Sequence, residues 1–284
     1  MPVMPALPDP AYEAEYNLRA RHADSDTLVA RWTGESERVR RTLPCLLDQR
    51  YGDEPNATLD LFPARTAGAP ILVFIHGGYW RRLDKADHSF IAEAPVANGA
   101  AVAVLNYDLC PAVTIETIVA ECRAATAWVY RNAAKLNGDP ARLYVTGHSA
   151  GGHLTATTLA TDWQALGLPA DLIKGGLPLS GVFDLHPIIL TSINDDTRLN
   201  RETAERLSPL YRKPHHLPPI VAAVGAGETF AFLEQTRLYA DAWRRWGGEA
   251  THLVVPGVHH FDVLLELARA DSRLGRSLFT LMSL

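Results

Sequence analysis

The chain has 284 residues, which is enough for one large α/β domain or two small ones, and folding can bury most of the surface that the unfolded chain exposes. Its 47% hydrophobic and 21% charged residues are ordinary for a soluble globular protein, and no run of eighteen apolar residues predicts a membrane span. The net charge of −5 gives no reason to expect nucleic acid or an anionic membrane as a partner.

The cysteine content and the first residues bear on the cellular compartment. Cys45, Cys110 and Cys122 are an odd number, and their spacing fits neither a C-x-x-C motif nor a zinc site. We therefore expect reduced thiols in the core. The start, MPVMPALPDPAYEAEYNL, lacks the basic and apolar segments of a signal peptide, so we expect a cytoplasmic protein.

The first fifty residues are polar and of mixed charge, and we expect them to form an N-terminal helical extension, residues 1–50. Helical patterns within it cover residues 9–20 and 26–41. From the segment YGDEPNATLDLFPA onward, apolar runs bounded by Gly, Pro and Asp replace this pattern. No linker or repeat divides the chain, so we expect a single domain, residues 1–284.

Six apolar runs rich in β-branched residues predict β-strands. They cover residues 71–75, 101–105, 143–146, 177–180, 220–224 and 252–255. The clearest helix between them is TIETIVAECRAATAWVYRNAAKLNG, which we expect to end at Gly138 as a C′ glycine. Residues 191–210 predict a helical excursion over one edge of the sheet, near the site. This alternation predicts an α/β fold, a mostly parallel sheet with helices on both faces.

A Gly-x-Ser-x-Gly motif follows the strand at 143–146, in the segment GHSAGGHL from Gly147 to Leu154. On a tight strand-to-helix turn the flanking positions must lack side chains, and the serine Oγ stands exposed at the top of the sheet. A strand precedes this motif and helix signals follow it. Ser149 is therefore the predicted nucleophile.

A serine nucleophile needs a base within hydrogen-bond distance, and in this kind of fold the base follows the serine in the chain. His259 and His260 lie just after the last predicted strand, where a loop reaches back over the edge of the sheet. Four other histidines are weaker candidates, because they neighbour the serine or lie in a proline-rich loop: His148, His153, His215 and His216.

The acid that orients the base should follow the strand at 220–224, and Glu228 is the first carboxylate there. It would fix the imidazole tautomer and stabilise the imidazolium. Two alternatives stay open at this point. Asp184 follows the preceding strand, and Asp262 resembles an acid at the start of a helix.

Acyl transfer develops negative charge on a carbonyl oxygen, which preorganised backbone N–H groups stabilise. One such donor follows the nucleophile, here Ala150. The others come from the loop after the strand at 71–75, which reads HGGYW.

Four motifs in this order, HGGYW, GHSAGGHL, LSGVFDLHPI and GVHHFDVLLEL, resemble the kynurenine formamidase (arylformamidase) branch of the α/β-hydrolases, related to the hormone-sensitive-lipase-like esterases. The resemblance spans residue 51 to the C-terminus. It implies an α/β-hydrolase fold and hydrolysis of an N-formyl amide on an aromatic amine such as N-formylkynurenine, a step of tryptophan catabolism. It implies an acyl-enzyme, and neither metal nor cofactor.

The resemblance also assigns residues. The family's base precedes Phe, which selects His260 over His259. The acid falls on Glu228, where animal members typically have aspartate. The oxyanion donors become the N–H groups of Gly78 and Tyr79.

We expect Trp80, Tyr107 and Phe261 to line an aromatic pocket, and Tyr79 and Trp80 to favour a small acyl group. The alternative is that the last two rings pack the loop against the extension. A short-chain carboxylesterase and a non-catalytic binding module are the rival functions. We expect a small-molecule substrate and no nucleic-acid or membrane partner, and we leave a homodimer open.

Overall fold

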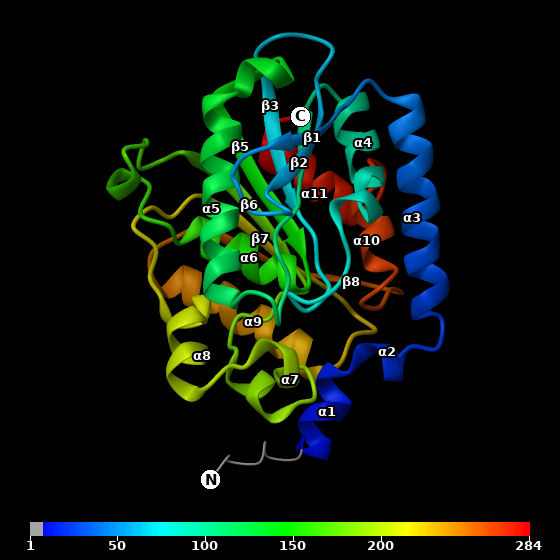
Figure 1. The fold of residues 1–284 in the computed structure, drawn as a ribbon, viewed down its shortest axis with the longest axis vertical. Helices are drawn as coiled ribbons and strands as arrows, with labels where there is room; N and C mark the ends of the chain where they lie inside the picture. Colours follow the sequence, from blue (N-terminus) through cyan, green and yellow to red (C-terminus); the bar gives the residue numbers. More distant parts are fainter. Residues whose placement is uncertain (1–7) are drawn as a thin grey trace.

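The computed structural model describes residues 8–284, and this part of the chain contains an eight-stranded sheet in the order β1-β2-β4-β3-β5-β6-β7-β8 (Figure 1). The strands are β1 Leu46–Arg50, β2 Thr58–Phe62, β3 Ala69–Ile75, β4 Ala101–Leu105, β5 Gly138–His148, β6 Ile173–Leu179, β7 Ile220–Gly225 and β8 Ala250–Val255. β2 pairs antiparallel with β1 and β4, and every other pair is parallel. The predicted α/β fold is confirmed.

Helices cover both faces of this sheet. They are α1 Pro10–Tyr16, α2 Leu18–Arg21, α3 Ser25–Thr42, α4 Glu93–Ala97, α5 Ile115–Arg131, α6 Ala150–Leu159, α7 Asn194–Thr197, α8 Arg201–Leu207, α9 Phe230–Arg245, α10 Val263–Leu267 and α11 Arg273–Met282. Successive residues of a strand face opposite sides. In β6, Gly175 faces Leu281 of α11, and Gly176 faces Leu159 of α6. These two helices therefore lie on opposite faces.

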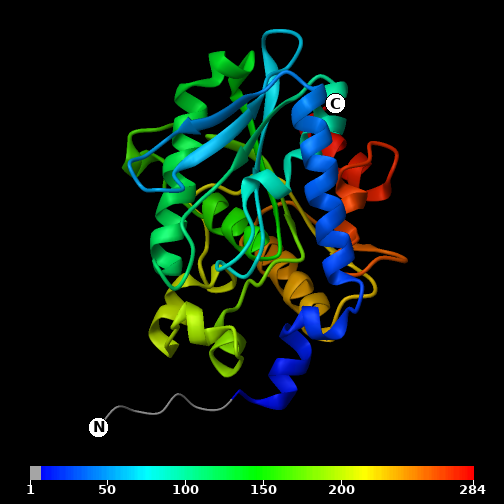
Figure 2. The same cartoon turned by 45° about the vertical axis from the view of Figure 1, so that its right-hand side comes forward.

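The N-terminal helices pack along the sheet and around one end of the molecule. Figures 1 and 2 show α3 running beside the sheet, and α1 at the end where α7 and α8 lie, opposite the C-terminus. α3 is joined to the segment that follows HGGYW, since Arg38 pairs with Glu93 at 2.6 Å and Thr33 Oγ1 donates to Asp87 at 2.8 Å. The extension is thereby tied to the loop that leaves β3.

Two strands were not predicted. β1 lies at the end of the segment expected to be helical. It is an edge strand that buries almost nothing, and even Leu46 and Leu47 are exposed, so it shows no alternation of apolar and polar residues that would predict a strand. β2 carries a buried aspartate, Asp60, whose charge is matched by Lys85 Nζ at 2.7 Å. A carboxylate within an apolar run argues against a buried strand, unless the cation that neutralises it can be identified from the sequence.

The end of the long helix was also predicted wrongly. α5 ends at Arg131, a short 3₁₀ turn follows at Ala133–Leu136, and the left-handed residue is Asn137 at φ 53°. Gly138 instead begins β5. Asparagine tolerates the left-handed region, so the turn needs no glycine. Among the described helices, none combines the length and the hydropathy needed to cross a bilayer.

Candidate active site

Ser149 lies on the turn between β5 and α6, with φ 60° and ψ −120°. Its amide donates to Leu179 O at 2.9 Å, and Ser149 lines a cavity beside this turn. Gly147 and Gly151 have ordinary backbone angles, so they supply space and not conformational freedom. A Cβ at Gly147 would strike Gly151 O, and one at Gly151 would strike Ile75 O. The strain is carried by the serine itself.

His260 and Glu228 form a buried pair beside this turn. His260 Nδ1 lies 2.6 Å from Glu228 Oε2, and both side chains are almost fully buried. The other carboxylate oxygen, Oε1, accepts from Gly225 N at 2.8 Å and from Ser180 Oγ at 2.5 Å. A carboxylate so engaged can only accept from Nδ1–H, which leaves Nε2 of the imidazole as the acceptor.

The alternative acids lie elsewhere. Asp184 Oδ1 is 2.7 Å from His186 Nδ1, and Asp184 Oδ2 accepts from Tyr211 at 2.9 Å. Asp262 accepts from the amide of His259 at 2.6 Å, at the start of α10. Neither carboxylate is bonded to His260, so the structure offers Glu228 as its partner.

The alternative bases are engaged or distant. His259 Nε2 faces Asp24 at 3.2 Å, and His153 is held between Leu207 O at 2.9 Å and the indole of Trp80 at 3.2 Å. His148 lines the cavity next to His260. The proline-rich segment that carries the last two candidates, His215 and His216, does not reach the cavity.

The HGGYW loop makes a chain of left-handed residues, with φ 105° at Gly78, 52° at Tyr79 and 59° at Trp80. A Cβ at Gly78 would strike Arg82 O, so this position requires glycine. His76 holds the start of the loop, because its Nδ1 donates to Gly77 O at 2.8 Å. On the opposite side, Ala150 is the first residue of α6, where an amide has no acceptor within the helix.

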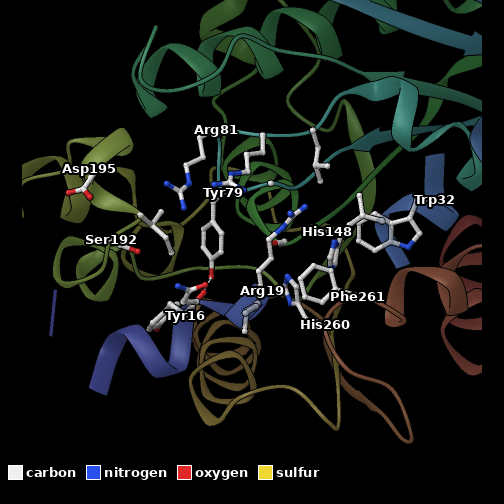
Figure 3. A pocket seen from close by; sticks show the side chains of 18 residues that line it. Tyr16, Arg19, Trp32, Tyr79, Arg81, His148, Ser192, Asp195, His260 and Phe261 are labelled. Carbon is white, nitrogen blue, oxygen red and sulfur yellow. Dashed lines mark hydrogen bonds between the residues drawn. The ribbon is translucent and has the colours of Figure 1, made fainter. Parts of the chain in front are cut away.

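The cavity has a volume of about 440 Å³ (Figure 3). Ser149, His260, Gly78 and Tyr79 line it, as does Phe261. Two residues expected in the pocket do not line it. Trp80 is fully buried against His153, and Tyr107 is buried in a stack on His76 with ring centroids 4.2 Å apart. Both rings serve the packing beneath the loop.

Comparisons with known proteins show the family of this chain. The BD-FAE family model matches residues 59–167. A kynurenine formamidase from Salmo salar is 31% identical over 255 residues, which cover 87% of this chain and 85% of that relative. The chain belongs to the kynurenine formamidase family. It is a serine hydrolase of the formamidase and esterase group.

Solved structures place this family member among the α/β-hydrolases. A protein from Silicibacter sp. TM1040, provisionally described as a thioesterase, has a TM-score of 0.80 at 30% identity, and the match covers 92% of this chain and 96% of the other. An esterase from Pyrobaculum calidifontis has a TM-score of 0.73 at 20% identity, covering 92% and 93% respectively, and therefore shares the fold.

The main feature of this formamidase-family cavity that the sequence did not reveal is its N-terminal wall. The extension contributes six lining residues: Tyr16, Asn17, Leu18, Arg19, Val29 and Trp32. Trp32 is 1% exposed and stacks on Phe261, with centroids 6.1 Å apart. The sequence signal for this wall is the helical spacing of Trp32, Ser36 and Val39, which predicts that one face of α3 is buried but does not identify its partner.

Residues of the expected helical excursion form another part of the wall. Ser192, Ile193 and Asp195 line the cavity from the start of α7. Ser192 is fastened to the extension, since its amide and hydroxyl donate to the Glu13 carboxylate at 2.8 and 2.7 Å. The two walls are thus joined to each other over the site.

Burial favours the neutral form of two groups beside the nucleophile. Burial holds the pKa of His148 well below its ordinary value of 6.5, and its ring centroid lies 4.5 Å from that of His260. Burial also raises the pKa of Tyr79 well above 10, and its hydroxyl donates to Tyr16 O at 2.7 Å.

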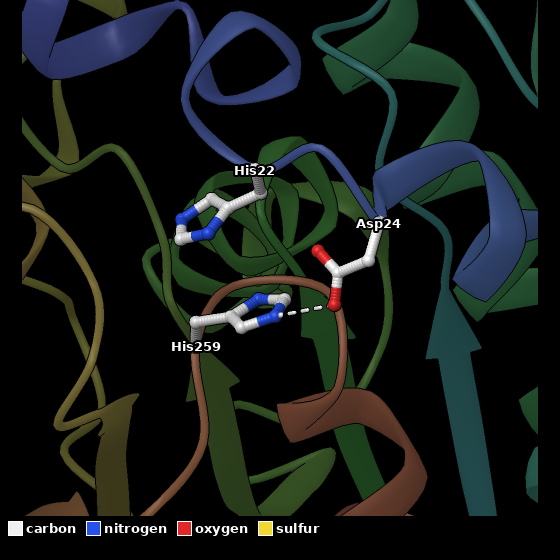
Figure 4. A group of neighbouring side chains, drawn as sticks. All are labelled: His22, Asp24 and His259. Carbon is white, nitrogen blue, oxygen red and sulfur yellow. Dashed lines mark hydrogen bonds and ion pairs between the residues drawn. The ribbon is translucent and has the colours of Figure 1, made fainter.

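His22, Asp24 and His259 gather where the extension meets the loop of His260 (Figure 4), with one ligand atom from each within 4.8 Å of the others. The two imidazoles stack with centroids 4.2 Å and planes 15° apart, so their in-plane lone pairs do not converge on one ion. His259 Nδ1 accepts from the amide of Phe261 at 3.2 Å, which makes Nε2–H the donor to Asp24. This cluster suits a contact between segments better than a metal site.

Proposed function

We propose that this enzyme removes the formyl group from N-formyl aryl amines, with N-formylkynurenine as the type substrate, using Ser149 as nucleophile, His260 as base and Glu228 as the acid. The observation that carries the proposal is the 2.6 Å bond between His260 Nδ1 and Glu228 Oε2, next to a cavity that Ser149 and His260 both line. The family's formamidase relatives support the choice of substrate class.

The proposed reaction has two halves. His260 Nε2 takes the Ser149 Oγ proton as Oγ bonds to the formyl carbon, and the oxyanion is held by the N–H groups of Gly78, Tyr79 and Ala150. The C–N bond then breaks, and His260 gives the same proton to the leaving aryl amine. A water next attacks the formyl ester as His260 takes its proton, and the C–O bond to Ser149 breaks as His260 returns this proton to Oγ. The product is formic acid, which ionises to formate.

Protonation of the leaving group matters more here than in ester hydrolysis, because an anilide anion is a far poorer leaving group than an alkoxide. The imidazolium must therefore be stable long enough to act as an acid. Glu228 supports this step, since it is fully buried and its second oxygen is already held by Gly225 and Ser180.

The cavity walls suit an aromatic substrate that also bears a carboxylate. Leu18, Val29, Trp32 and Phe261 offer apolar surface. Three arginines line the same cavity, and two of them have acidic partners: Arg81 pairs with Asp196 at 2.6 Å, and Arg19 pairs with Asp26 at 2.9 Å. Within residues 8–284, Arg82 has no ion-pair partner. A guanidinium is a good ligand for a carboxylate.

The decisive experiment measures kcat/KM of the purified protein on N-formylkynurenine and on p-nitrophenyl acetate, with Ser149→Ala as the control. We expect a strong preference for the formamide, and loss of both activities in the variant. A preference for the acetate ester would instead support the rival, a short-chain carboxylesterase.

A fluorophosphonate probe separates either enzyme from a non-catalytic binding module. We expect the probe to label the wild type and not Ser149→Ala.

We also propose that the enzyme acts in the cytoplasm on a small-molecule substrate. Support comes from Cys45, Cys110 and Cys122, which are all free thiols, as expected in a reducing compartment.

A further inference from the structure

Ser180 stands out as a strained residue directly after β6. It is fully buried, and its φ is 50°, in the left-handed region that favours glycine. A residue with a Cβ is disfavoured there, and such conformations persist where the surrounding structure requires them. Glycine would fit this backbone better than serine. The presence of serine therefore suggests that its hydroxyl has a function.

The contacts of Ser180 connect two parts of the proposed machinery. The peptide unit between Leu179 and Ser180 accepts from the Ser149 amide at 2.9 Å through its carbonyl, and donates to Ala223 O at 2.7 Å through its N–H. The Ser180 hydroxyl donates to Glu228 Oε1 at 2.5 Å. Ser180 therefore contacts Glu228 directly, and it directly follows Leu179, whose carbonyl accepts from the Ser149 amide.

We propose that Ser180 is a positioning residue, whose hydroxyl holds the Glu228 carboxylate so that Oε2 points at His260 Nδ1. The inference rests on the proposed function, in which Glu228 is the acid. Glutamate has one more rotatable bond than aspartate, so its carboxylate has more orientations to lose. Donation to Oε1 from both Ser180 and Gly225 restricts these orientations.

Two variants test this: Ser180→Ala keeps the strained backbone and removes the hydroxyl, and Ser180→Gly removes both the hydroxyl and the strain. We expect both to lower kcat for p-nitrophenyl acetate by about 10-fold or more, the usual size for a lost hydrogen bond to a buried charge. KM should stay within about 2-fold, because the carboxylate does not touch the substrate. We expect Ser180→Gly to be the more thermally stable of the two.

Thr158→Val is the matched control, because Thr158 Oγ1 makes a buried 2.7 Å bond to Leu154 O away from the carboxylate. It should lower the melting temperature and leave kcat unchanged. Wild-type kcat in Ser180→Gly would overturn the proposal, as would activity that follows stability across the three variants. If Ser149→Ala also hydrolysed the ester, the proposed function would fail, and that result is distinct from either outcome at Ser180.

Discussion

Replacing Glu228 with glutamine tests the acid with almost no change in shape. The new amide can lie in only one orientation. Gly225 N is a donor 2.8 Å from Oε1, so the oxygen of the amide must stay there, and the NH₂ group then faces His260 Nδ1. Two donors cannot share that 2.6 Å contact, so Nδ1 becomes the acceptor and the proton moves to Nε2. The imidazole can then no longer take the Ser149 proton.

The expected loss in Glu228→Gln is roughly 10⁴-fold in kcat, the size found for the equivalent amide substitution in serine proteases, or about 5 kcal/mol of transition-state stabilisation. The assay is steady-state hydrolysis of N-formylkynurenine and p-nitrophenyl acetate, with thermal melting to confirm folding.

Asp184→Asn is the matched control for this substitution. Its carboxylate is bonded to His186 and Tyr211 and should leave kcat near wild type. Glu228 is not the acid if Glu228→Gln keeps more than a tenth of the activity, or if Asp184→Asn is the variant that loses it.

Three further changes probe the cavity and the core. Tyr79→Gly suits the φ of 52° and removes the ring from the cavity, so butyryl esters should gain relative to formyl esters; an unchanged acyl-length series would contradict this. Arg82→Gln should raise KM about 10-fold for 2-formamidobenzoate and leave formanilide unchanged, whereas equal effects would count against a carboxylate contact. Burial raises the pKa of Glu121 from 4.5 to about 7, although the amide of Asp108 donates to it. The folded state therefore binds this proton more tightly, and stability falls as the pH rises from about 4.5 through 7. Glu121→Gln should flatten that fall by at most about 3 kcal/mol in urea titrations at pH 5 and 8, and parallel curves would refute the assignment.

The sequence predicted those features whose interacting residues lie close together along the chain, or whose positions the fold class determines. The turn at Ser149 and the loop at Gly78 obey local rules of backbone angle and close approach, so short motifs predicted both. The bond between His260 and Glu228 joins two loops that follow neighbouring parallel strands, and fold class alone makes their edges coincide. Their catalytic roles stay predictions until the variants are measured.

The cavity walls could not be predicted in this way. Trp32 packs on Phe261, and Glu13 accepts from Ser192, although the two residues of each pair lie more than 170 positions apart in the sequence. The local sequence around one residue does not identify the other. The same limit explains the misplaced aromatics. Trp80 and Tyr107 look like pocket residues in isolation, yet each ring finds a buried histidine to pack against.

The N-terminal wall has a consequence for how the protein is made. Trp32 and Tyr16 are synthesised well before their aromatic neighbours Phe261 and Phe232. The extension cannot bury its apolar face on these rings until both of them have left the ribosome. The substrate cavity is therefore among the last parts of the molecule to close.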